Sequence, residues 1–193
     1  MSRVSAREKL LKAAGELFYD HGITATGVDA VITRAGVAKM SLYNNFKSKS
    51  ELIAAYIDAR HQEWLDLFAH RSDNLSNGWE RVLAVFDAYQ DHAEFDYQNG
   101  FRGCGLLNAA AEMPADSAER EAVNRHKQEV RGIVLNQLSE LPLTEESGNT
   151  AALLAEHICF LLEGSISLAG LSRDVQAISR ARAMADKLIE NAL

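Results

Sequence analysis

The side chains that could perform catalysis or bind metal are scattered along this chain. It contains 6 His and 2 Cys in 193 residues. Di-metal sites in helical bundles need Glu-x-x-His pairs on two helices, and no glutamate here is followed three residues later by histidine. An HExxH motif is also missing, and GCGLLN from Gly103 matches only part of a dinucleotide-binding fingerprint. We therefore expect neither an enzyme, nor a cofactor, nor a metal site.

The cysteines allow one further chemistry. Cys104 and Cys159 lie far apart, so we expect reduced thiols rather than a structural disulfide. FRGCGLL places Cys104 between two glycines at the expected start of a helix, where the helix dipole would make a thiol more reactive. Cys104 is then either a sensor of oxidants or electrophiles, or a small hydrophobic residue in the core. Cys159 lies in ICFLL and is expected to be core.

A different chemistry, DNA binding, is indicated by GVAKMSLYNNF at residues 36–46. The glycine separates two short helical patterns, and in residues 38–45 only Leu42 is expected to point inward. The remaining polar side chains stay on or near the outer surface. Such an arrangement is typical of a helix-turn-helix, whose second helix enters the major groove of DNA.

The distribution of charge agrees with this interpretation. The chain has a formal net charge of -7. Residues 1–56, however, hold 8 Lys or Arg against 5 Asp or Glu, a net of +3, and the remainder carries -10. A phosphate backbone would attract the first part and repel the second.

The elements that position these residues are all helical, so we predict an all-α fold of about nine helices. Ser5 with Glu8 makes a capping box for a helix that ends at Gly22, and Thr26 is expected to cap the next helix. Ser48 with Glu51 opens a long helix through Phe68. Later helices are expected from Asn77, over GLLNAAAEM, from Asp116, from Thr144 to Gly170, and from Asp174 to the end. We predict a DNA-binding domain at 1–47 and a second, larger helical domain at 48–193.

Neither the N-terminus nor the most apolar stretch indicates export or membrane insertion. MSRVSAREKLLKAAGEL has no continuous apolar segment of the kind found in signal peptides. HICFLLEGSISLAGL is interrupted by Glu163, so we predict a buried helix rather than a membrane span. The expected location is the cytoplasm.

The chain resembles the TetR family of transcriptional regulators through two ungapped stretches, LLKAAGELFYDHGITATGV and ITRAGVAKMSLYNNFKSKSELI. The resemblance covers about the first quarter of the chain. It implies a double-stranded, palindromic DNA operator bound by a homodimer. Thr26, Tyr43 and Lys49 match positions that contact phosphates, and Lys39, Met40, Ser41 and Asn44 match positions that read bases. Lysine and asparagine donate to base edges and a methionine can contact a thymine methyl, which agrees with these roles.

The resemblance also implies a small-molecule effector, apolar or aromatic, bound between the DNA-binding module and the last helices. The candidate residues are Trp64, Phe68, Trp79, Phe86, Tyr89, Phe101, Cys104 and His126. The alternative is that these rings only fill the core of a constitutive DNA-binding protein. In the first case the effector would tilt the long fourth helix, move the two recognition helices and release the operator, as a repressor does.

The last two helices are the candidates for dimerisation, because their apolar stripes are broad enough to form a four-helix interface between two chains. The predicted residues are Leu154, Ile158, Leu161, Ser165, Leu168, Ile178 and Ala185.

Overall fold

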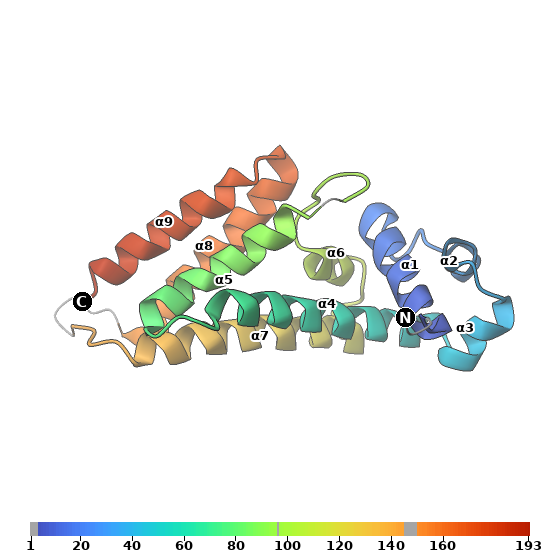
Figure 1. The fold of residues 1–193 in the computed structure, drawn as a ribbon, viewed down its shortest axis with the longest axis horizontal. Helices are drawn as coiled ribbons and strands as arrows, with labels where there is room; N and C mark the ends of the chain where they lie inside the picture. The colour runs from blue at the N-terminus through green and yellow to red at the C-terminus, as the bar shows by residue number, and fades with distance from the viewer. Residues whose placement is uncertain (1–3, 96, 145–149) are drawn as a thin grey trace. The chain divides into compact units, whose positions relative to one another are not determined.

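A computed structural model describes residues 4–95, 97–144 and 150–193, and those residues form nine helices and no strand (Figure 1). This confirms the predicted all-α class. The helices are α1 (Ala6–His21), α2 (Val28–Ala35), α3 (Lys39–Asn45), α4 (Lys49–Ser72), α5 (Gly78–Ala93), α6 (Gly105–Ala111), α7 (Ala118–Ser139), α8 (Ala151–Ser172) and α9 (Gln176–Glu190).

Most helix starts follow local capping rules. Ser5 and Glu8 form the predicted capping box of α1, and the side chain of Asn77 accepts a hydrogen bond from the Glu80 amide at the start of α5. Thr150 caps α8, so this helix begins later than the expected Thr144, and residues 145–149 in between lie outside the described part. The prediction that Thr26 caps α2 is wrong, because the N-cap residue is Gly27 and no side chain caps this helix.

The chain packs as two compact units. One contains the residues up to Gln62 together with Gly105–Asn124, and the other contains Glu63–Cys104 and Arg125–Leu193. Each of the helices α4 and α7 therefore contributes residues to both units. The predicted functional division between residues 47 and 48 remains a proposal, since it concerns roles rather than packing.

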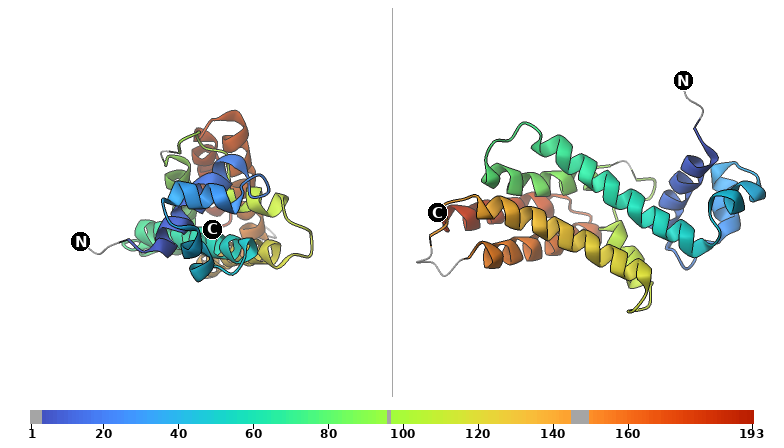
Figure 2. Two further views of the ribbon diagram at one scale, coloured as in Figure 1. Left: turned by 90° about the vertical axis from the view of Figure 1, so that its right-hand side faces the viewer. Right: turned by 90° about the horizontal axis from the view of Figure 1, so that it is seen from below.

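The first unit is built around α1, which packs against α2, α3 and α6 (Figure 2). The Phe18 ring meets the Tyr56 ring of α4 edge-on at 5.4 Å between centroids. Other buried side chains of this core are Leu10, Ala14, Ile23, Val31, Leu42, Phe46 and Leu52. Burial of these apolar side chains supplies most of the stability of the unit, because helices as short as α2 and α3 are marginal alone.

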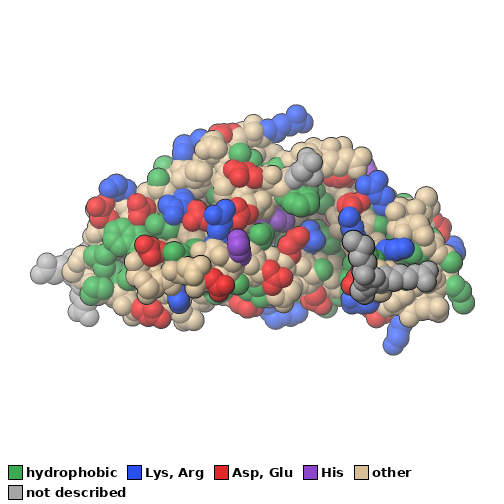
Figure 3. Space-filling model, viewed as in Figure 1, with side chains coloured by type: hydrophobic (Ala, Val, Ile, Leu, Met, Phe, Trp, Pro, Cys, Tyr) green, Lys and Arg blue, Asp and Glu red, His purple; other side chains and the backbone are tan. Residues whose placement is uncertain are grey.

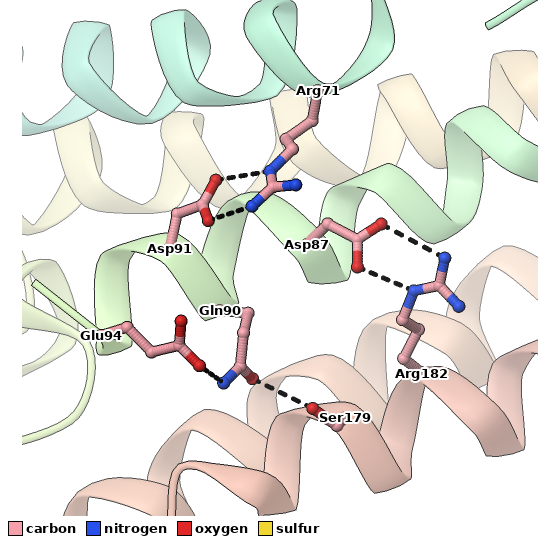
Figure 4. A network of polar contacts seen from close by, with 7 residues as sticks. All are labelled: Arg71, Asp87, Gln90, Asp91, Glu94, Ser179 and Arg182. Carbon is pink, nitrogen blue, oxygen red and sulfur yellow. Dashed lines mark hydrogen bonds and ion pairs between the residues drawn. The ribbon is translucent and has the colours of Figure 1, made fainter.

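The second unit is an apolar bundle in which α9 packs against both α8 and α5 (Figure 1). Its fully buried side chains include Phe86, Val134, Leu154, Ile158, Leu162, Ile178 and Ile189. A polar network on α4, α5 and α9 accompanies this core (Figure 4). Arg182 forms two parallel hydrogen bonds with Asp87, at 2.8 and 3.2 Å, and Arg71 pairs with Asp91 in the same manner. These partly exposed pairs fix the orientation of the helices more than they add stability.

Candidate nucleic-acid interface

The turn between α2 and α3 is formed by Gly36, which adopts the left-handed conformation with φ of 62°. Its amide donates to the carbonyl groups of Ile32 and Thr33, and the amide of Val37 donates to Ile32 at 3.4 Å. A residue with a side chain would be strained at this φ, so glycine makes the turn possible. The turn sets the direction in which α3 leaves α2.

Helix α3 buries only Leu42. Lys39, Met40, Tyr43 and Asn44 are exposed, Met40 by 68% and Tyr43 by 46%. Ser41 is half-buried. The predicted base-reading residues therefore share a short helix whose polar and apolar side chains are open to solvent, as contact with base edges in a groove requires.

Ion pairs with other helices orient part of this surface. Lys39 Nζ donates to Asp29 Oδ1 of α2 at 3.0 Å, and this hydrogen bond is the largest cause of the raised pKa of Lys39. Arg34 contacts Glu16 of α1 at 2.7 Å. Both pairs are exposed and salt would screen them, so they hold the Lys39 and Arg34 side chains only weakly.

Two of the predicted phosphate-contacting side chains are engaged inside the first unit. The Thr26 hydroxyl is buried and donates to the carbonyl of Gly22 at 2.7 Å. Lys49 Nζ donates to the carbonyl of Ile23 at 2.6 Å and is half-buried. Of the three predicted phosphate contacts, Tyr43 has the freest side chain. Thr26 and Lys49 fix the segment between α1 and α2.

Sequence reasoning missed Glu112, which acts on the same segment. Its carboxylate accepts hydrogen bonds from the amides of Ile23 at 3.0 Å and Thr24 at 2.7 Å. Burial acts to raise the pKa of Glu112, but these amides and the charge of Lys49 outweigh it, so the pKa is lowered. No local pattern signals this contact, because 88 or 89 residues separate the partners.

In the second unit, several of the predicted effector residues lie together. The Trp64 ring stacks on Phe68 at 5.6 Å, lies 5.4 Å from the Tyr89 ring and meets His126 edge-on at 5.6 Å. The buried Trp64 Nε1 has no hydrogen-bond partner among the described residues. Trp79, by contrast, donates to Asp186 of α9, Phe86 is fully buried in the core, and the Phe101 ring packs at 6.2 Å from Tyr97.

Lys127 and Glu163, which the sequence analysis did not single out, complete this cluster. Lys127 Nζ lies 2.7 Å from Glu163 Oε1, 3.5 Å from the Tyr89 hydroxyl and 3.6 Å from Cys104 Sγ. Its side chain is only 16% exposed. Burial acts to lower the pKa of Lys127, yet its neighbours, Glu163 among them, raise it, so it is an ammonium at neutral pH. Burial likewise raises the pKa of Tyr89, which keeps the phenol protonated.

The predicted dimerisation residues mostly point into the protomer itself. Those fully or nearly fully buried in the second unit are Leu154, Ile158, Ser165, Ile178 and Ala185. Leu161 is half-buried, and Leu168 is exposed. Because α8 is apolar on nearly every side, its sequence did not reveal which face packs into the core.

The outward face of α8 and α9 carries large apolar side chains. The exposed residues are Leu153, Phe160, Leu168, Leu171 and Met184, with Phe160 at 67% and Leu171 at 85%. By length and composition α8 is apolar enough to cross a bilayer, although the core helix of a soluble protein can meet the same criterion. The prediction that Glu163 brings this stretch below the limit is therefore wrong as far as length and composition go.

Among the described residues, neither the distribution of charge nor the arrangement of metal-binding side chains indicates a further site. On the face of the second unit seen in Figure 3, acidic and basic side chains are interspersed. Within the described residues, no group of three or more His, Cys, Asp or Glu is arranged to hold a metal ion.

Comparison with known proteins identifies the family. Residues 10–56 match the profile described as bacterial regulatory proteins, tetR family, and this range contains the whole of α2, the turn and α3. SCO4454, a TetR-family transcriptional regulator from Streptomyces coelicolor, superposes with a TM-score of 0.84 at 26% identity, covering 97% of this chain and 95% of that one. The chain therefore carries the N-terminal domain of the TetR family and has the fold of a TetR-family regulator. A second TetR-type structure, from Streptomyces avermitilis, has a TM-score of 0.78 at 27% identity and covers 98% of both chains.

Curated relatives match over a shorter region. The HTH-type transcriptional activator FasR of Mycolicibacterium smegmatis is 34% identical over 102 residues, which is 53% of this chain and 46% of FasR. The HTH-type transcriptional repressor KstR2 of the same organism is 35% identical over 98 residues, 47% of this chain and 46% of KstR2. The matches thus span about half the length of these relatives.

Proposed function

We propose that this TetR-family protein is a ligand-responsive transcriptional regulator that binds a palindromic operator in the bacterial cytoplasm and has no catalytic role. The observation that carries the proposal is α3, a short helix after a left-handed glycine turn that buries only Leu42. Its exposed Lys39, Met40 and Asn44, with the half-buried Ser41, would read base edges in the major groove. Tyr43 and Lys49 would contact phosphates, and the segment at Thr26 would do so through its backbone amides.

Operator binding by such a module requires two copies, and the exposed apolar face of α8 and α9 supports a homodimer. Leu153, Phe160, Leu168 and Leu171 recur at helical spacing along α8, on the side opposite to its core stripe. Burying this stripe against the same stripe of a second copy would form a four-helix interface with two-fold symmetry. Two-fold symmetry in turn would make the two half-sites of the operator palindromic.

The aromatic cluster of the second unit is the proposed effector site. Trp64, Phe68 and Tyr89 offer ring faces for an apolar or aromatic molecule. The unpartnered Trp64 Nε1 would donate a hydrogen bond to an acceptor on that molecule, which would offset the cost of its burial. An effector preferring one arrangement of this cluster would shift α4, whose N-terminal part belongs to the DNA-binding unit. The expected result is release of the operator, hence repression in the absence of effector.

The test is selection of bound sequences from a random DNA pool, followed by titration of wild type and Tyr43→Ala at fixed salt. We expect a palindromic site that wild type binds tightly and the variant binds about tenfold more weakly, because a phosphate contact is lost. Thermal shift with apolar aromatic compounds would then identify effectors, since ligands of the folded state raise Tm. Failure to enrich any sequence would refute the proposal.

A second candidate, regulation through the Cys104 thiol, is favoured by one observation, the 3.6 Å contact between Cys104 Sγ and Lys127 Nζ. If this candidate is correct, treating the protein with iodoacetamide should release the operator from wild type and from Cys159→Ser, but not from Cys104→Ser. Equal release from all three would refute it. This arrangement uses the second cysteine as a matched control, and burial raises the pKa of the Cys159 thiol to about 11.

A further inference from the structure

The segment that joins α1 to α2 is held by a carboxylate from far along the chain. Glu112, which directly follows α6, accepts hydrogen bonds from the Ile23 amide at 3.0 Å and from the Thr24 amide at 2.7 Å. Hydrogen bonds from backbone amides to an ionised carboxylate are roughly twice as strong as neutral ones. These two hydrogen bonds connect the residue that follows α6 to the segment leading into the helix-turn-helix.

The same peptide is held from its other side. Lys49 Nζ of α4 donates to the Ile23 carbonyl at 2.6 Å, so the amide and the carbonyl of Ile23 both have charged partners. The Thr26 hydroxyl donates to the Gly22 carbonyl at 2.7 Å. Residues 22–26 therefore have side-chain partners on α4 and just after α6, in addition to contacts within the segment itself.

The backbone at Gly22 leaves room for the Glu112 side chain. Gly22 has a φ of 89°, and a Cβ at this position would lie 2.7 Å from Glu112 Oε1. No residue with a side chain could keep both this conformation and this distance. This close approach indicates that the carboxylate occupies a defined position at the C-terminal end of α1.

The opposite end of α6 is also fixed to α1. A Cβ on Gly105 would lie 3.1 Å from Tyr19 Cδ2 and 3.1 Å from the Tyr56 hydroxyl oxygen, so the backbone of Gly105 packs closely on both side chains. Arg120 Nη1 further donates to the Ala110 carbonyl at 3.0 Å. Since α6 is attached at its start by Gly105 and at its end by Glu112, any movement of α6 would pull on residues 23 and 24.

We propose that Glu112 is a positioning residue for operator binding, which sets the direction of α2 and α3 by holding the amides of Ile23 and Thr24. The inference rests on the proposed function, because it concerns the affinity for an operator. Withdrawal of Glu112 from the segment would weaken binding without touching a base-reading residue.

The test compares Glu112→Ala with Glu121→Ala in the full-length protein. Both changes remove one negative charge from the same unit, but Glu121 is an exposed residue in the first turn of α7. Operator affinity is measured at fixed salt and at a temperature where circular dichroism shows all proteins fully folded. Amide hydrogen exchange of Ile23 and Thr24 is followed by NMR.

A loss of charge alone and a loss of positioning predict changes in operator affinity of opposite sign. Removing a negative charge from a DNA-binding unit should by itself leave affinity unchanged or increase it, and we expect this of Glu121→Ala. Glu112→Ala should instead bind the operator about tenfold more weakly, which is the size expected when hydrogen bonds to a charged group are lost. Exchange at Ile23 and Thr24 should become at least about tenfold faster in this variant alone.

Equal affinity of the two variants would overturn the inference, as would weaker binding by Glu112→Ala with unchanged exchange at Ile23 and Thr24. If Glu112→Ala does not fold, Glu112→Gln, which keeps the side-chain length, is judged by the same two criteria. The proposed function fails separately, because in that case wild type itself would select no operator.

Discussion

At the scale of single residues, the recognition surface depends on what α3 leaves exposed. Met40 is 68% exposed and Tyr43 46%, whereas Leu42 between them is buried. An exposed methionine on a seven-residue helix buries little of its surface in the core, which leaves the side chain available for the base contact proposed above. The same holds for Lys39, whose only described partner is the exposed Asp29 at 3.0 Å.

We predict that Lys39→Ala relaxes the preference for one base in each half-site and costs about 1–3 kcal/mol of discrimination there. The reason is that an ammonium at the start of a recognition helix can donate to a guanine edge. Selection from a random pool, repeated with the variant, measures the change.

Lys47→Ala is the matched control, because Lys47 is also exposed but lies after α3. It should weaken all sequences alike and reduce the salt dependence of binding by about one unit of slope. If Lys39→Ala behaved like this control, Lys39 would be a phosphate contact and not a base reader.

At the scale of elements, α6 illustrates how a short helix becomes essential to its neighbours. Its seven residues match no motif, and the sequence predicts only a helix over GLLNAAAEM. Its importance comes from Gly105 and Glu112, which join it to α1 and to the segment after α1. The α1–α2 segment is thus determined by residues outside the predicted DNA-binding domain.

Gly22→Ala should destabilise the protein by about 2 kcal/mol, with contributions from the positive φ and from the collision with Glu112. In the Glu112→Ala background the collision disappears, so the same substitution should cost only about 1 kcal/mol. Urea unfolding of the four proteins gives this double-mutant cycle. If Gly22→Ala lowered the free energy of unfolding equally in the two backgrounds, Glu112 would not occupy the position described beside Gly22.

The lowered pKa of Glu112 predicts a pH dependence. A carboxylate whose pKa is lower in the folded state adds stability above its ordinary value of 4.5, and this stability is lost as pH falls through the folded value. The difference in unfolding free energy between wild type and Glu112→Gln should therefore be constant from about pH 7 to about pH 5 and shrink below about pH 4. Urea titrations at each pH measure it. A difference that grew on acidification would contradict the assigned hydrogen bonds.

At the scale of the whole molecule, α8 has to satisfy two environments. One stripe, including Ile158 and Leu162, lies in the core, and a second stripe that includes Phe160 and Leu171 is exposed. An exposed stripe of large apolar side chains favours an interaction surface. A second copy of the chain is the partner proposed here.

Phe160→Asp should convert the dimer into a monomer, because a carboxylate would be buried without a partner in the interface. Light scattering after size exclusion should show half the wild-type mass, and operator affinity should fall because one protomer reads only one half-site. Phe95→Asp is the control, since Phe95 is 65% exposed but lies outside α8 and α9. Retention of the dimer by Phe160→Asp would exclude this face.

The sequence by itself determined what is encoded within a few residues. The capping box of Ser5 and Glu8, the turn at Gly36 and the inward Leu42 were all predicted, because caps, turns and helical periodicity act over one or two helical turns. These features gave the position of α3 in the sequence and the resemblance to the TetR family. They also gave the nine helices that the described residues form.

Only the tertiary structure decided which face of an apolar helix is covered and which distant polar groups meet. Five predicted dimerisation side chains, among them Ile158 and Ile178, are buried in the protomer, because α8 offers apolar residues on both sides and periodicity cannot choose between them. The Thr26 hydroxyl, which is predicted to contact a phosphate, donates to the Gly22 carbonyl, and Glu112 accepts hydrogen bonds from Ile23 and Thr24, which lie nearly ninety residues away in the sequence. Such pairings depend on the packing of whole helices, since their partners share no local pattern in the chain.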